Sequence, residues 1–310
     1  GMRILFMGTP EFARESLRAM VEDGREVVCV ITQPDKPKGR GYETAMPEVK
    51  KYALEHNIDV YQPQSLKDNA ISDILEKYRP DIIIVVAYGK LLPEYVLNYP
   101  KYGCINIHGS LLPKYRGAAP IQRAVMNGEK VSGVTSMYME KGLDTGDMLL
   151  KEELEITPDM TAGMLHDALA AVGGRVLLKT LDCAGNGTLK PQKQDDSLSS
   201  YASMLSKKEG ELDWNDSAEH IYNKVRGLNP WPGAFSYLCG KRFMIDFAYP
   251  EKECGKPGEV LRADDEGILV ACGDESVRIK SVKFDGKKKM TVSQYLNGHK
   301  IEKGTVLGKE

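Results

Sequence analysis

The chain has 310 residues, with 42 lysines and arginines against 44 aspartates and glutamates, which gives a formal net charge of −2. This length predicts two domains. A hydrophobic share of 42% is typical of a globular protein with a buried core. The near-neutral charge argues against a chain that wraps nucleic acid through bulk positive charge, so a nucleic-acid partner would have to bind a local basic patch.

The apolar segments and the cysteines exclude further classes. No apolar run reaches the roughly 18 residues that a membrane-spanning helix needs. The first residues lead directly into a strand-like segment without a charged leader, so no export is expected. The cysteines are scattered, without a C-x-x-C pair, and indicate free thiols rather than a disulfide framework or a metal site. We therefore expect a cytoplasmic protein that uses no metal and no membrane, and the sequence points to no protein partner.

The first 190 residues alternate apolar runs with helical patterns, which predicts βα units and a Rossmann-like, mostly parallel sheet. Strands are expected at residues 3–8, 27–32, 59–62, 81–87, 104–108, 134–140 and 148–156. Helices are expected at residues 10–20, 47–56, 66–78, 120–126 and 161–181. The unbroken Ile and Val run within 81–87 is typical of a central strand that is covered on both faces.

The composition changes after residue 189. Residues 190–206 carry Pro, Gln, Asp and several Ser with few large apolar side chains, so they are the predicted linker. A helical pattern follows at 218–228, and then short strands at 234–238, 243–247, 258–262, 267–271 and 277–282. This spacing predicts a small, OB-like β-barrel at 207–310, after an α/β catalytic domain at 1–189.

The most informative segment is the strand Cys104-Ile105-Asn106-Ile107-His108. Alternate side chains of a strand share a face, so Cys104, Asn106 and His108 point the same way. Asn106 and His108 are separated by about 6.6 Å along the strand, which leaves room for a small electrophilic centre between them. They lie at the carboxyl end of a parallel strand, where ligands bind in open α/β sheets. A packed core histidine is the alternative for His108, but the neighbouring amide weakens it, because a buried amide must find a partner.

Two loops follow this strand. Leu111-Leu112-Pro113 and Arg116-Gly117 predict a rigid loop suited to binding a flat ligand by backbone hydrogen bonds. Gly142–Asp147 is an acidic turn bracketed by glycines. Ordinary turn chemistry accounts for Asp147 and leaves Asp144 undecided. The chain has neither a Walker A loop nor a G-x-G-x-x-G motif after the first strand, so a nicotinamide cofactor is not expected.

Together these segments resemble the folate-dependent formyltransferase family, whose catalytic Asn and His lie at one strand end and whose catalytic Asp lies on a separate loop. Further blocks carry the resemblance across both predicted domains: Phe6–Ala13, Thr32–Asp35, Val85–Gly89, Ala118–Gln122 and Asn229–Pro232. The resemblance implies 10-formyltetrahydrofolate as formyl donor. It implies folate contacts at Ser110, Leu111, Leu112 and Pro113, and catalytic roles for Asn106, His108 and Asp144.

The resemblance also implies direct attack of an amine on the formyl carbon. Asn106 would donate to the developing oxyanion, an effect typically worth about 2.7–4 kcal/mol. His108, oriented by Asp144, would add to that stabilisation, and Asp144 would help to remove the proton. A thioester route through Cys104 is the rival mechanism. A buried cysteine commonly serves as a small hydrophobe, and no feature of the sequence would lower its pKa.

The acceptor is inferred from finer comparisons within the family. Ala118 and Ala119 stand where sugar-nucleotide members tend to carry another Arg, and glycinamide-ribonucleotide members generally lack the C-terminal domain. These differences favour the initiator methionyl-tRNA as acceptor and folate and tRNA as the partners. A UDP-aminosugar is the alternative acceptor. A non-catalytic tRNA- or folate-binding protein is a third reading, against which the complete Asn, His and Asp set argues.

Two local basic segments are the candidate tRNA contacts. The glycine-rich loop 34–47 contributes Lys38 and Arg40, although Tyr42-Glu43-Thr44 stands where family members often carry lysines. The run 278–289 contributes Lys287 and Lys288. Such patches neutralise phosphates, but a solvated surface explains the run equally well.

Overall fold

A computed structural model of the chain describes residues 1–37 and 44–308. The fold divides into two compact units. Unit 1 comprises Gly1–Gly117, Val131–Leu154 and His166–Ala202, and unit 2 comprises Ala118–Lys130, Glu155–Leu165 and Ser203–Glu310. Two segments that precede residue 189 therefore pack in unit 2, and residues 190–202 of the predicted linker pack in unit 1. The functional division at 189 and 206 stays a prediction.

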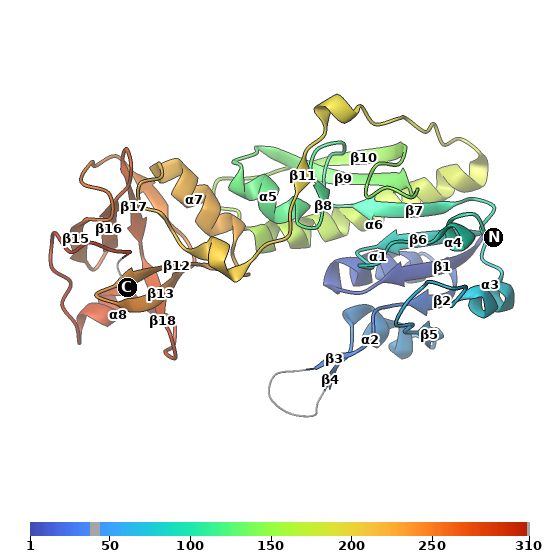
Figure 1. Ribbon diagram of the computed structural model, residues 1–310, viewed down its shortest axis with the longest axis horizontal. Coiled ribbons are helices and arrows are strands. Elements are labelled where there is room, and N and C mark those ends of the chain that lie inside the picture. The colour runs from blue at the N-terminus through green and yellow to red at the C-terminus, as the bar shows by residue number, and fades with distance from the viewer. Residues whose placement is uncertain (38–43, 309–310) are drawn as a thin grey trace. The chain divides into compact units, whose positions relative to one another are not determined.

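Unit 1 is built on a seven-stranded sheet with the order β10-β9-β7-β6-β1-β2-β5 (Figure 1). Strands β1, β2, β5, β6 and β7 run parallel, and β9 is antiparallel to β7. Their bounds are β1 Arg3–Gly8, β2 Glu26–Ile31, β5 Val60–Tyr61, β6 Ile82–Val86, β7 Cys104–His108, β9 Val131–Tyr138 and β10 Met148–Glu155. The prediction of a mostly parallel α/β sheet is confirmed, and β1 and β7 have the predicted bounds.

Helices cover both faces of this sheet. On one face, Gly173 of α6 (Ala162–Asn186) comes close to Ile107 of β7 and to Phe12 of α1 (Glu11–Glu22). On the other face, the core joins α3 (Ser72–Tyr78) and α4 (Glu94–Leu97) to the strands. Helix α2 (Glu48–Glu55) follows the short strands β3 (Lys36–Pro37) and β4 (Thr44–Ala45). The sheet is thus buried on both faces, as the apolar run of β6 predicts.

The predicted helix at 66–78 is wrong in its first turn and a half. Asp68 and Asn69 have φ angles of 57° and 59°, in the left-handed region, so α3 begins only at Ser72. A right-handed helix cannot include such residues. Asp and Asn adopt this conformation more readily than other residues, and the apolar periodicity alone does not reveal it.

Unit 2 consists of two four-stranded antiparallel sheets with helices. The sheet orders are β12-β13-β18-β19 and β14-β17-β16-β15. The bounds are β12 Ala234–Leu238, β13 Lys241–Ile245, β14 Tyr249–Glu251, β15 Val260–Asp264, β16 Gly267–Ala271, β17 Ser276–Ile279, β18 Ser281–Phe284 and β19 Met290–Thr291. One core joins these strands to Ile221 and Val225 of α7 (Ala218–Gly227). The predicted strand-rich C-terminal domain is confirmed.

Three elements of unit 2 differ from the expectation. The predicted strand 277–282 is interrupted at Lys280, which separates β17 from β18. Strand β14 and the short helix α8 (Val292–Leu296) were not expected. A capping box begins α8, because the Thr291 side chain accepts from the Gln294 backbone N–H and the Gln294 side chain accepts from that of Thr291. Helix α5 (Pro120–Met126) has its predicted bounds, begins with a proline in its first turn and also packs in unit 2.

Candidate active site

Strand β7 presents Asn106 and His108 at its carboxyl end. Its alternation is as predicted: Ile107 packs toward α6, whereas the Cys104 thiol lies on the opposite face, 3.7 Å from the carbonyl oxygen of Val96. Asn106 is half-buried, and His108 is 7% exposed. Asn106 pairs in register with Val85 of the neighbouring central strand β6. The two polar side chains therefore belong to a rigid part of the sheet.

The acidic turn brings Asp144 to this strand end. The Asp144 carboxylate is 7% exposed and accepts a hydrogen bond from Asn106 Nδ2 at 3.4 Å through Oδ1. Its Oδ2 accepts from the backbone N–H of Gly117 at 2.9 Å and lies 3.8 Å from His108 Nδ1. Three segments that are distant in sequence thus converge on one carboxylate. Asp147 remains a turn residue: its side chain is exposed, and its carbonyl oxygen accepts from the backbone N–H of Tyr138.

The hydrogen bonds of His108 define which nitrogen carries the proton. Nε2 lies 2.7 Å from the carbonyl oxygen of Tyr115. A carbonyl oxygen only accepts, so Nε2 is the protonated nitrogen of the neutral ring. Nδ1 then faces the Asp144 carboxylate, 3.8 Å from Oδ2. His108 is therefore oriented by a hydrogen bond at Nε2 and has a carboxylate near its other nitrogen.

The acidic turn has a strained backbone at Asp144. Its φ angle is 57°, in the left-handed region, at a cost of about 1–2 kcal/mol. Two residues later, a Cβ atom on Gly146 would lie 1.7 Å from the carbonyl oxygen of Tyr138, so only glycine fits there. Strain of this kind persists only where the surroundings hold the residue firmly. The close approach of Gly146 to Tyr138 thus requires glycine on one side of Asp144.

The Cys104 thiol is poorly placed for the rival mechanism. It belongs to the core between the sheet and α4, and burial raises its pKa to about 12. The thiolate is the nucleophilic form, so this thiol is almost entirely unreactive near neutral pH. The structure supports the reading of Cys104 as a small buried hydrophobe.

The loop Ser110–Pro113 is organised by two residues that sequence reasoning missed. Thr135 Oγ1 donates to the carbonyl oxygen of Ser110 at 2.7 Å and accepts from the backbone N–H of Leu112 at 3.1 Å. Lys151 Nζ donates to the carbonyl oxygen of Leu112 at 2.5 Å, and burial lowers the pKa of this lysine. Several backbone groups that were expected to bind a flat ligand are thus already bonded within the protein. The loop is preorganised, and its folate contacts stay a prediction.

The Ser110 hydroxyl is also engaged, because it donates to the carbonyl oxygen of Lys114 at 2.7 Å. Thr135 is buried on β9 next to the loop, and the only sequence signal for it is a threonine inside an apolar strand. A polar side chain in such a strand must find partners, which here are the backbone groups of the loop.

The predicted linker also contributes to the site. Gln194 is 4% exposed, and its side-chain amide donates to the carbonyl oxygens of Asp144 and Gly146. Strand β11 (Tyr201–Ala202) pairs with β8 (Arg116–Gly117). The polar residues that indicated a linker thus include some that bind the loops of unit 1. A single sequence gives no sign that Gln194, one glutamine within a polar segment, is buried.

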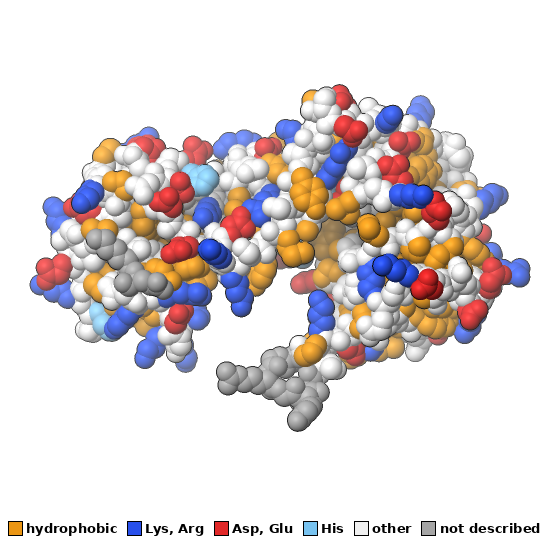
Figure 2. Space-filling view, in the orientation of Figure 1, with side chains coloured by type: hydrophobic (Ala, Val, Ile, Leu, Met, Phe, Trp, Pro, Cys, Tyr) orange, Lys and Arg blue, Asp and Glu red, His pale blue; other side chains and the backbone are white. Residues whose placement is uncertain are grey.

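The candidate tRNA contacts divide into two groups. Lys38 and Arg40 lie outside the described residues. Lys287 and Lys288 are exposed at the turn between β18 and β19, and Figure 2 shows Lys and Arg side chains gathered at this edge of unit 2. Arg278, at the start of the same basic run, does not belong to the surface: it is 7% exposed on β17 and pairs with Glu251 at 3.0 Å.

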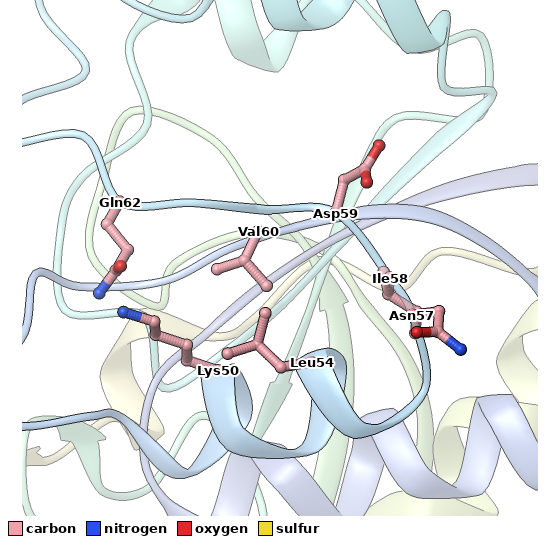
Figure 3. Close-up of a pocket in the computed structure, with 7 residues that line it drawn as sticks. All are labelled: Lys50, Leu54, Asn57, Ile58, Asp59, Val60 and Gln62. Carbon is pink, nitrogen blue, oxygen red and sulfur yellow. The ribbon is translucent and has the colours of Figure 1, made fainter.

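Two cavities lie outside the site. One, of about 480 Å³, is lined by residues of α2, of β5 and of the chain around them, with Lys50 and Gln62 at one end (Figure 3). Both of these side chains bind the Asp35 carboxylate. The other, of about 300 Å³, lies in unit 2 between Asn229 and Lys283. Neither cavity is lined by a predicted catalytic or folate-binding residue.

Two features are absent from the described part of the chain. Among residues 1–37 and 44–308, no group of three or more His, Cys, Asp or Glu side chains could hold a metal ion. Across the same ranges, no helix combines the length and the apolar character that crossing a membrane requires.

The chain belongs to the formyl transferase family. Residues 2–181 match the family described as formyl transferase, and residues 204–300 match the formyl transferase C-terminal domain. These matches confirm the resemblance that the strand, loop and turn motifs carry.

The particular relatives are close over the full length. A methionyl-tRNA formyltransferase from Ruminiclostridium cellulolyticum is 50% identical, and the alignment covers 99% of this chain and 100% of the relative. One from Acetivibrio thermocellus is 51% identical with the same coverage. Among solved structures, an N-formyltransferase from Helicobacter canadensis is similar in fold with a TM-score of 0.68 at 19% identity, and covers 92% of this chain and 100% of its own. HypX from Aquifex aeolicus, with tetrahydrofolic acid bound, has a TM-score of 0.63 at 22% identity and covers 98% of this chain and 50% of its own.

Proposed function

We propose that this protein transfers a formyl group from 10-formyltetrahydrofolate to the α-amino group of the initiator methionyl-tRNA, which gives N-formylmethionyl-tRNA for translation initiation. The observation that carries the proposal is the convergence of Asn106, His108 and Asp144 at the carboxyl end of β7. Relatives about half identical over the full chain are named for this activity. An enzyme of translation initiation works in the cytoplasm, which is the proposed location.

The arrangement of the three side chains fits direct transfer. The α-amino group has a reference pKa near 7.7–8.0, so a useful fraction is neutral at pH 7. Its nitrogen forms a bond to the formyl carbon, the formyl oxygen becomes an oxyanion, and the bond from carbon to N10 of the folate then breaks. The amine loses one proton and N10 gains one, so the step balances without a covalent enzyme intermediate.

Each side chain has a separate role in this step. The Asn106 amide donates to the oxyanion, and His108 adds stabilisation because its ring is held between Tyr115 and Asp144. The Asp144 carboxylate accepts the proton of the attacking amine, directly or through one water. The Asn106 amide and the Gly117 N–H donate to its two oxygens, which hold the carboxylate at the strand end.

The donor would lie along the loop Ser110–Pro113, next to the end of β7. Thr135 and Lys151 hold the backbone of this loop, so a bound folate would meet a preformed surface. The solved structure of HypX, which is similar in fold, contains tetrahydrofolic acid, and this supports a folate donor for the present chain. The proposal assigns the apolar side chains of Leu111, Leu112 and Pro113 to contact the flat ring system.

The acceptor distinguishes this proposal from its alternative. The alternative acceptor is a UDP-aminosugar. A sugar 3N-formyltransferase and an N-formyltransferase in complex with dTDP-3-aminofucose share the fold at TM-scores of 0.69 and 0.68, which supports a nucleotide-linked aminosugar as the second candidate. Transfer of labelled formyl from 10-formyltetrahydrofolate to methionyl-tRNA and to a UDP-aminosugar, measured in parallel, tests the choice. We expect rapid formylation of methionyl-tRNA and none of the sugar. Exclusive formylation of the sugar would replace the proposal by the alternative, and an inactive protein on both would contradict formyl transfer.

A further inference from the structure

We propose that Gln194 is a positioning residue for the formyl-transfer reaction, which fixes the acidic turn so that the Asp144 carboxylate faces Asn106 and His108. The inference rests on the proposed function and names a residue beyond the three polar groups at the strand end. Gln194 is 4% exposed and lies in the segment whose composition predicts only a linker. It touches the turn, and no contact places it against the reacting atoms.

The hydrogen bonds of Gln194 use its whole side-chain amide. Nε2 donates to the carbonyl oxygen of Asp144 at 2.9 Å and to that of Gly146 at 2.7 Å. Oε1 accepts from Nε of Arg116 at 3.1 Å. The two carbonyls can only accept and the guanidinium can only donate, so the amide has one chemically possible orientation. No aspartate or glutamate offers this combination of two donors and one acceptor.

One hydrogen bond of Gln194 is made to Asp144, the residue of the acidic turn with the strained backbone. Asp144 holds a left-handed backbone conformation, and Gln194 binds the carbonyl oxygen of that residue. The side chain of the same Asp144 accepts from Gly117 at its other end. Backbone and carboxylate are thus held from two directions, which limits rotation of the carboxylate away from His108.

The segment around Gln194 reinforces this hold. Gln192 and Met148 exchange backbone hydrogen bonds of 2.8 and 2.9 Å just after the turn. Arg116, which binds Gln194, also pairs with Asp196 at 2.7 Å, and the backbone N–H of Tyr115 donates to Ser200 Oγ at 2.9 Å. Tyr115 is the residue whose carbonyl oxygen accepts from His108. The segment 192–200 therefore connects the acidic turn to the loop that orients His108.

Two substitutions separate positioning from packing. Gln194→Met is nearly isosteric and removes both donors and the acceptor. Gln194→Glu keeps the acceptor for Arg116 and removes the donors to the turn. The control is Gln192→Met, the same chemical change at an exposed position two residues earlier. Within residues 1–37 and 44–308, the hydrogen bonds of Gln192 are those of its backbone, which the substitution keeps.

We expect both Gln194 variants to lower kcat by about 10–100-fold, because a displacement of about 1 Å in a catalytic group has effects of this size. KM for donor and acceptor should change less than threefold, and Gln192→Met should behave as the wild type. The Gly117 amide resonance, which reports its bond to Asp144, should shift in both variants. A wild-type kcat in Gln194→Glu, together with a lowered kcat in Gln194→Met, would show that only the hydrogen bond with Arg116 matters. That result would overturn the proposal, because the bonds to the acidic turn would then have no effect.

The experiment distinguishes this proposal from the proposed function. If the wild type formylates a sugar amine instead of methionyl-tRNA, the same kcat ratios are measured with that acceptor and the role of Gln194 is still tested. If Gln194→Met fails to fold, Gln194→Glu carries the test alone. An unshifted Gly117 resonance with unchanged kcat in either folded variant would contradict the proposal whatever the acceptor is.

Discussion

Strand β7 contributes side chains to the site, whereas the segment 192–202 contributes hydrogen bonds to the backbone that surrounds those side chains. The strand is regular: its period of two assigns Asn106 and His108 to one face from the sequence alone. The segment is irregular, polar and mostly exposed, and its buried side chains are Gln194 and, at its end, Ala202. Candidate catalytic side chains can thus be recognised in a sequence by residue type and spacing. The residues that hold them in position can be recognised only from the contacts in the structure.

The largest effect is expected at the acidic turn itself. Asp144→Asn keeps the shape of the side chain and removes its charge, so kcat should fall about 10²–10⁴-fold, the range for loss of a general base. Steady-state formylation of methionyl-tRNA measures it. Asp147→Asn, the same change three residues later at an exposed position, is the control and should keep wild-type kcat. An equal loss of kcat in both variants would contradict the assignment of Asp144 to the active site and of Asp147 to the turn alone.

A substitution at Gly117 tests the segment 192–202 from the opposite side. Gly117 has a φ angle of +105°, and an added Cβ would lie 2.8 Å from the carbonyl oxygen of Ala202 and from the Tyr201 ring. Gly117→Ala should therefore displace the N–H that binds Asp144 and lower kcat about 10–100-fold. It should also lower the free energy of unfolding by about 1–3 kcal/mol.

Gly187→Ala is the matched control for this change. Gly187 also has a positive φ angle, +68°, but no atom lies within 4 Å of its added Cβ. This variant should lose about 1–2 kcal/mol of stability and no activity. Denaturant unfolding and kcat, measured on both variants, separate backbone strain from the collision with β11. A fall in kcat for Gly187→Ala as large as that for Gly117→Ala would contradict the assignment.

A smaller effect is expected for the exposed lysines of unit 2. Lys287→Glu with Lys288→Glu should weaken tRNA binding several-fold near 0.1 M salt and reduce the slope of log K against log salt by about 1–2, because each phosphate contact contributes roughly one counterion. Lys252→Glu with Lys303→Glu changes the net charge equally at exposed positions outside the basic run and serves as control. Equal slopes for the two double variants would show that Lys287 and Lys288 act only through net charge.

The smallest effect on activity is expected at Cys104. Cys104→Ala should keep wild-type kcat, since burial raises the thiol pKa to about 12. Its folded pKa is above the unfolded value near 8.5, so the thiol's stabilisation is complete below pH 8.5 and is lost as pH rises toward 12. The difference in unfolding free energy between wild type and variant should therefore shrink as pH rises from 9 to 11. A large loss of kcat would reinstate the thioester route.

Much of the fold could be predicted because its signals are periodic. The apolar strands and the amphipathic helices of unit 1 follow periods of 2 and 3.6, and β1, β7 and α5 have their predicted bounds. The start of α3 was wrong because left-handed residues such as Asp68 leave no periodic trace. Helix α8 was missed because five residues are too few for a periodic pattern.

The site was predictable to a similar degree and for related reasons. Asn106 and His108 follow from the pleat of a strand, and Asp144 from a resemblance of motifs. Thr135, Lys151 and Gln194 could not be found in this way, because each acts through a backbone carbonyl or N–H group that any residue would supply. Arg278 shows the opposite case: a charged residue in a basic run is buried, as is every other residue of β17.

The partition of the chain has a consequence for synthesis on the ribosome. Helix α5 emerges early, yet Ala119 and Met126 form their apolar cluster with Leu205 and Leu228. At elongation rates of about 5–20 residues per second, α7 is synthesised several seconds after α5, so α5 lacks this packing partner during that time. Unit 1 has all its segments once residue 202 is synthesised, whereas unit 2 exposes an unpaired apolar helix until its later strands follow. A nascent chain halted near residue 200 would therefore expose the apolar side chains through which α5 packs in unit 2.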